Sequence, residues 1–161
     1  MARPKNKPKS ARKAVARKKT TARRARAVAA PKRRPPQAFV ASHHREEDFK
    51  TDGLRTYAKY RDLGIAKATN GLALAHVIRF VPPCRPEEVS KLHFHDVEFQ
   101  MIYVLKGWIK TELEGQGAHV MRPGSAWIQP PKIKHTVRGY SDDCELLEIV
   151  LPANFDTVTL K

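Results

Sequence analysis

Short runs of strand-forming residues, separated by glycine and proline, fill the chain from residue 54 onward. No segment repeats its apolar residues at helical spacing for more than two turns. Many short strands separated by glycine and proline are typical of a β-sandwich or β-barrel, so we predict an all-β domain. The predicted strands occupy 72–80, 99–107, 108–115 and parts of 118–131 and 134–152, and the second and third of these form a hairpin or a close relay.

Charge divides the chain into two parts. Residues 1–40 contain 15 Lys or Arg and no Asp or Glu, whereas residues 41–161 contain 16 basic and 16 acidic residues. The formal net charge of +15 therefore lies wholly in the first part. Because Val15 and Val28 are its only larger apolar side chains between Met1 and Phe39, that part cannot bury a core. We predict a disordered tail over 1–40 and a single folded domain over 41–161.

The composition of the tail allows two interpretations. Residues 1–37 can bind nucleic acid non-specifically through phosphate contacts, which need positive charge and no base readout. They contain no aromatic residue for base stacking, and the chain shows no helix-turn-helix, so sequence-specific recognition is not indicated. Alternatively, the tail is a solubilising extension without a partner.

The rest of the composition indicates a cytoplasmic protein. Cys84 and Cys144 are far apart and form no CxxC pair, which favours a reducing compartment. No run of eighteen apolar residues could cross a membrane, and no apolar stretch follows the charged N-terminus as in a signal peptide.

Metal-ligand chemistry concentrates in the run HFHDVEFQMIYVLKG, residues 93–107. His93 and His95 are two apart on an extended segment, so their side chains leave the same face about 7 Å apart at the backbone and can converge on one ion. After residues 96–98 the alternation reverses and places Gln100 at the start of the inward-facing row.

This run resembles the first characteristic motif of the cupin superfamily, G-x5-HxH-x3,4-E-x6-G, through His93, His95, Gln100 and Gly107. The second cupin motif, G-x5-PxG-x2-H-x3-N, resembles GSAWIQPPKIKHTVRG through Gly124, Pro130 and His135. The flanks are similar to small bacterial single-domain cupins, so the resemblance extends over about 52–156. Four residues depart from the motifs, since Glu87, Gln100, Lys132 and Gly139 replace Gly, Glu, Gly and Asn.

The resemblance implies a jelly-roll barrel, also called a double-stranded β-helix, that holds one divalent ion such as Fe, Mn, Zn or Ni. The family pattern carries the ligand roles to His93, His95, Gln100 and His135. Glu98 has the same alternation phase as Gln100 and is the alternative fourth ligand. The alternative reading of each histidine is a surface or hydrogen-bonded strand residue, and three histidines at motif spacing, with a Pro-Pro turn before the third, argue against it.

We expect an enzyme that acts on a small oxygenated metabolite by dioxygenase-like or isomerase-like chemistry. Tyr103 and Glu98 are the candidates for a catalytic acid or base. The alternative is a non-catalytic module that binds a metal or metabolite and is held on nucleic acid by its tail, and a purely structural role is a third reading. Pairing through edge strands predicts a homodimer.

Several other polar and aromatic residues have no assigned role. His76 lies in an apolar run and is interpreted as a core histidine, and His43, His44 and His119 are left unassigned. Arg79, Tyr103 and Trp127 either line the pocket or fill the barrel, and Arg79 could instead pair with an acidic neighbour.

Overall fold

The computed structural model describes Met1 and residues 36–53 and 55–160. The chain divides into two units, residues 1–33 and residues 34–161, and the second carries the fold. Most of the predicted tail, residues 2–35, lies outside the described residues. The tail and its nucleic-acid binding therefore stay predictions.

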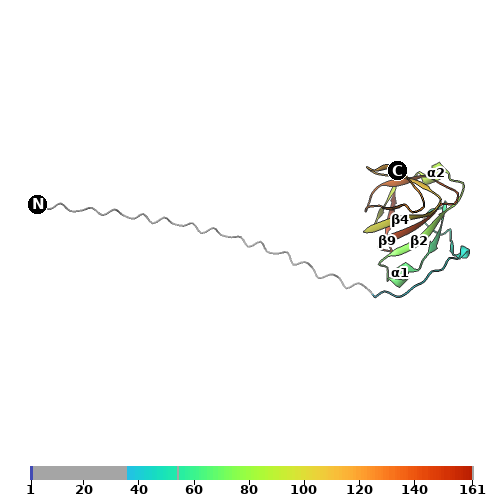
Figure 1. The fold of residues 1–161 in the computed structure, drawn as a ribbon, viewed down its shortest axis with the longest axis horizontal. Helices are drawn as coiled ribbons and strands as arrows, with labels where there is room; N and C mark the ends of the chain where they lie inside the picture. Colours follow the sequence, from blue (N-terminus) through green and yellow to red (C-terminus); the bar gives the residue numbers. More distant parts are fainter. Residues whose placement is uncertain (2–35, 54, 161) are drawn as a thin grey trace. The chain divides into compact units, whose positions relative to one another are not determined.

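Ten strands and three short helical turns make up the described part of the second unit (Figure 1). The helical turns are η1 (Glu46–Asp48), α1 (Ile65–Ala68) and α2 (Pro86–Val89). The strands are β1 (Ala58–Asp62), β2 (Leu74–Phe80), β3 (His93–Asp96), β4 (Phe99–Lys106), β5 (Ile109–Leu113), β6 (Gly117–Met121), β7 (Ala126–Ile128), β8 (His135–Tyr140), β9 (Glu145–Leu151) and β10 (Asp156–Thr159). The prediction of an all-β domain is confirmed.

The strands form two five-stranded antiparallel sheets, with the orders β1-β2-β9-β4-β7 and β10-β3-β8-β5-β6. Figure 1 shows β2, β9 and β4 side by side in the first sheet. Strands β4 and β5 are consecutive in the chain but belong to different sheets, so they form a relay between the sheets and not a hairpin. This exchange of strands between two facing sheets is the jelly-roll arrangement.

Gly107 makes the crossing between β4 and β5 possible. Its φ of +65° lies in the left-handed region, which residues with a Cβ rarely adopt. A Cβ at this position would also collide with the side chain of Ser141 and would lie 2.8 Å from the Cα of Cys144. The chain therefore needs glycine where it leaves the first sheet.

The side-chain alternation of β4 follows the prediction. Gln100, Ile102 and Val104 are buried, whereas Tyr103 and Leu105 on the opposite face are exposed. Ile102 and Val104 belong to the hydrophobic core. This core comprises Tyr57, Ala58, Phe80, Val89, Ile102, Val104, Ile109, Tyr140, Cys144 and Leu146.

Residues 36–50, which we call the N-terminal strap, contact the first sheet and the turn around α1. The Ala38 N–H donates to the Ala68 carbonyl at 2.7 Å, and the Asn70 side-chain amide donates to the Pro36 carbonyl at 2.6 Å. Lys50 forms an isolated antiparallel bridge with Tyr60 beside the edge strand β1. Described contacts with the barrel thus begin at Pro36.

No helix among the described residues is long and apolar enough to cross a lipid bilayer.

Candidate metal centre

Three buried histidines from two neighbouring strands face one another. His93 and His95 lie on β3, His135 begins β8, and the two strands pair through His93 and His135. All three are between 5% and 7% exposed. One ring nitrogen from each lies within 4.8 Å of the others, a spacing that suits three ligands of one ion.

Backbone carbonyls fix the tautomers of His93 and His135. The Nδ1 of His93 lies 2.8 Å from the Lys91 carbonyl, and that of His135 lies 3.0 Å from the Ile133 carbonyl. A carbonyl oxygen can only accept, so each Nδ1 carries the proton and each Nε2 keeps its lone pair. That lone pair is the one that binds a metal.

The third imidazole is held by a side chain. The Nδ1 of His95 is hydrogen-bonded to Thr157 Oγ1 at 2.7 Å, and Thr157 is the register partner of His95 on β10. The last strand of the fold therefore orients a residue of β3. Sequence analysis missed Thr157, because 62 residues separate the two and only the strand register brings them together.

Burial keeps the three imidazoles neutral at pH 7. Burial, and then the neighbouring His135, lowers the pKa of His93 to about 3. Burial lowers the pKa of His95 to about 4, and it also lowers the pKa of His135. Three neutral imidazoles that face one another form a donor set that fits a divalent transition ion, so the residues present fit the metal that the resemblance implies.

The structure also shows the surroundings of the two candidates for a fourth ligand. Gln100 is 1% exposed, and its Nε2 donates to Glu148 Oε1 at 2.7 Å, so only its side-chain carbonyl oxygen could serve as a ligand. Glu98 is exposed on the connection between β3 and β4. Ligation by Gln100 stays a prediction.

Gln129 is a further polar group at the centre that sequence analysis did not identify. It is 4% exposed, and its amide nitrogen donates to His135 Nε2 at 3.2 Å. It therefore contacts the lone pair that would bind an ion. Its carbonyl oxygen accepts a long hydrogen bond of 3.4 Å from Trp127 Nε1.

A cavity of about 250 Å³ opens between the two sheets in front of the three histidines. Trp127 lines it, as one of the two interpretations proposed. The proposed acid–base candidates do not, because Tyr103 lies on the outer face of β4 and Glu98 is in the exposed connection. The apolar wall comes from Ile78, Phe80, Ile102, Ile109 and Leu146.

His76 and Glu148 form an ion pair or strong hydrogen bond on the cavity wall. They are register partners across β2 and β9, and His76 Nε2 donates to Glu148 Oε2 at 2.6 Å. Burial on its own would raise the pKa of Glu148, but the hydrogen bond and charge of His76, with the Gln100 amide, lower it overall. A carboxylate thus lies in the cavity. Its signal in the sequence was the inward phase that it shares with Leu146 and Val150.

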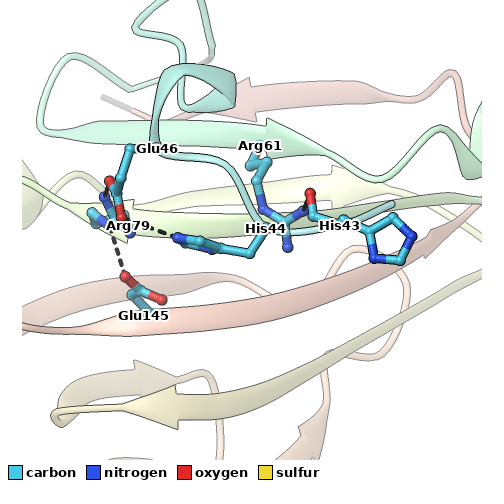
Figure 2. Close-up of polar contacts among 6 residues, drawn as sticks. All are labelled: His43, His44, Glu46, Arg61, Arg79 and Glu145. Atoms are coloured by element: carbon cyan, nitrogen blue, oxygen red, sulfur yellow. Dashed lines mark hydrogen bonds and ion pairs between the residues drawn. The ribbon is translucent and has the colours of Figure 1, made fainter. Parts of the chain in front are cut away.

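Arg79 lies outside the cavity, between the strap and β9. Its Nη1 donates to Glu46 and its Nε to Glu145, both at 2.6 Å, as Figure 2 shows. The prediction that Arg79 pairs with an acidic neighbour is confirmed.

The other histidines lie away from the cavity. Figure 2 also shows His44 directed toward Glu46, and the His43 carbonyl near Arg61. His119 on β6 contacts the Gln116 carbonyl at 3.0 Å.

Residues 84–150 match the family model described as a cupin domain. The chain belongs to the cupin superfamily. This cupin has no match among curated protein sequences.

Solved structures with the same fold include several cupins of low sequence identity. KdgF from a Halomonas species is 19% identical, with a TM-score of 0.55 over 70% of this chain and 96% of that one. The polyketide cyclase RemF from Streptomyces resistomycificus is 20% identical, with a TM-score of 0.58 over 74% and 85%. The oxalate decarboxylase of Lactobacillus farciminis is 16% identical, with a TM-score of 0.54 over 71% and 34%. At such identities the likeness shows the fold alone.

Proposed function

We propose that this cupin binds one divalent metal ion, such as Fe, Mn, Zn or Ni, through His93, His95 and His135, and that it acts on a small oxygenated metabolite. The supporting observation is the convergence of one ring nitrogen from each of the three histidines on one cavity, with each Nδ1 hydrogen-bonded to a neighbouring group. When bound, the ion would supply Lewis-acid or redox chemistry, as isomerase-like or dioxygenase-like reactions require. Gln100 is the proposed fourth ligand.

The residues that line the cavity can limit the size of the ligand, exclude water and hold a proton. About 250 Å³ is somewhat less than the range of about 300–1,000 Å³ typical of pockets for drug-sized ligands, so a small metabolite fits best. Ile78, Phe80 and Leu146 exclude water and thereby strengthen electrostatic interactions inside the cavity. His76 and Glu148 can hold or transfer a proton at Glu148 Oε2, and they replace Tyr103 and Glu98 as our acid–base candidates.

A non-catalytic module that binds a metal or metabolite is the second candidate. It is favoured by the tail, whose positive charge would hold the domain on nucleic acid.

We also propose a homodimer, because the edge strands β6 and β7 expose Val120 and Ile128, which are 49% and 57% exposed. Cys84 and Cys144 are both free, which supports a cytoplasmic location.

Metal analysis tests the proposal. The full chain, purified without chelator or added metal, is expected to contain close to one ion, and His135→Ala should lose most of it while the barrel stays folded. His119→Ala is the matched control, because His119 lies on an exposed strand outside the cavity. Stoichiometric metal in His135→Ala would refute the assignment. Oxygen uptake and product formation with a metabolite panel would then separate the enzyme from the binding module.

A further inference from the structure

Arg55 lines the cavity that the three histidines face, immediately before β1. Its side chain is partly buried, and its Nη2 atom is fully buried. Among the described residues, nothing accepts a hydrogen bond from this atom. A charged donor that is withdrawn from water without an acceptor is unfavourable, so the site lacks a partner for it.

We propose that Arg55 binds the anionic group of the substrate, and that the metabolite is a small carboxylate. The inference rests on the proposed function, since it concerns the ligand of the same cavity. A guanidinium presents its donors in a planar fork that matches the two oxygens of a carboxylate. The free Nη2 provides one of those donors.

No carboxylate of the cavity wall neutralises Arg55. Glu148 already accepts from His76 at 2.6 Å and from Gln100 at 2.7 Å. Arg55 and the three histidines line the same cavity. Arg55 therefore acts as an uncompensated cation at the metal centre.

The balance of charge favours an anionic ligand. The imidazoles are neutral, so a bound divalent ion would add two positive charges to that of Arg55, against one negative charge on Glu148. In a water-excluded cavity, an anion that contacts both the guanidinium and the ion relieves this excess. A neutral metabolite cannot do so.

Carboxylates fit the cavity better than phosphate esters. Arg55 is the only Arg or Lys among the described residues that line it, and much of the remaining lining is apolar. One cation matches the single charge of a carboxylate, whereas a phosphate ester carries nearly two charges at pH 7 and more acceptor oxygens. Ile78, Ile102 and Leu146 can contact the hydrocarbon part of the ligand.

Calorimetric titration of the full chain tests the inference. The probes are acetate, pyruvate and benzoate, with the neutral analogue pyruvamide and inorganic phosphate as comparisons. We expect at least one carboxylate to bind, Arg55→Gln to weaken that binding at least tenfold, and Arg55→Lys to weaken it less. Arg85→Gln is the control, because Arg85 pairs with Glu88 on the surface and should leave binding unchanged.

Three outcomes would overturn the inference: no carboxylate binds the parent chain, Arg55→Gln binds it equally well, or phosphate alone binds in an Arg55-dependent way. Thermal unfolding checks that the variants fold. Repeating the titrations after chelator treatment separates this inference from the metal assignment. If the chain holds no metal, the proposed function fails, but dependence of carboxylate binding on Arg55 in the metal-free protein still decides the inference.

Discussion

Substitution of Thr157 by Val tests whether the last strand controls the metal site. Thr157 Oγ1 is hydrogen-bonded to Nδ1 of His95, and it is the one side chain in this role, because the partners of His93 and His135 are backbone carbonyls. Valine keeps the shape and β-branching of threonine, so the strand should remain intact. The substitution therefore removes the hydrogen bond and little else.

The expected losses of metal affinity and of folding stability follow from the role of that hydrogen bond. Loss of a partner that orients a metal-binding histidine typically weakens metal binding by about 10- to 100-fold, or roughly 1.4–2.7 kcal/mol. A buried Nδ1 without a hydrogen-bond partner should also lower the free energy of unfolding of the metal-free protein by about 1–3 kcal/mol. Competition with a chromogenic chelator measures the first effect, and urea denaturation measures the second.

Thr159→Val is the matched control, because Thr159 is exposed on the same strand. It should leave both quantities within experimental error. If Thr157→Val bound metal within twofold of the parent, His95 would not depend on its Nδ1 partner, and its assignment as a ligand oriented through β10 would be wrong.

Three further predictions concern charge and protonation. Gln100→Glu should raise affinity for a divalent ion. It should also lower the Tm of the metal-free protein, because a carboxylate facing Glu148 replaces the amide that donates to it. Loss of metal in Glu98→Gln would instead identify Glu98 as the ligand. The native pKa values of His93 and His95, about 3 and about 4, lie below the unfolded value of about 6.5. Below pH 6.5 the unfolded chain therefore binds more protons, and metal-free stability should fall toward pH 4 by up to about 1.4 kcal/mol per pH unit for each histidine. Urea denaturation from pH 7.5 to 5 checks this, and a flat profile would contradict it. Deletion of residues 1–35 should abolish salt-sensitive retention on heparin with little change in Tm, whereas a large drop in Tm would show that the tail packs on the barrel.

Local sequence patterns were sufficient for most of the strands, although not for β1 and β10, and for the buried placement of His93, His95 and Gln100. The spacing of His93 and His95 on a strand requires both imidazoles on one face, and the reversal after residues 96–98 correctly placed Gln100 in the buried row. His135 was found through the resemblance, because nothing local to β8 connects it with β3. The register between those strands brings His93 and His135 together.

The remaining site residues depend on long-range register and could not be read from local patterns. His76 and Glu148 are 72 residues apart and meet only because β2 pairs with β9 in one particular alignment. Each looked like a single polar residue in an apolar run. Arg55 precedes β1 in a segment without periodicity, so its entry into the cavity had no signal in the sequence.

The two sheets contribute different parts of the cavity, and this separation matters for redesign. The three histidines belong to the sheet that contains β3 and β8, whereas Ile78, Ile102 and Leu146 belong to the opposite sheet. A combinatorial library at those three apolar positions would alter which molecules fit without changing a residue that contacts an imidazole nitrogen. Variants selected for new substrates should then keep the same metal content, because the mutations that change the substrate would not be mutations that weaken metal binding.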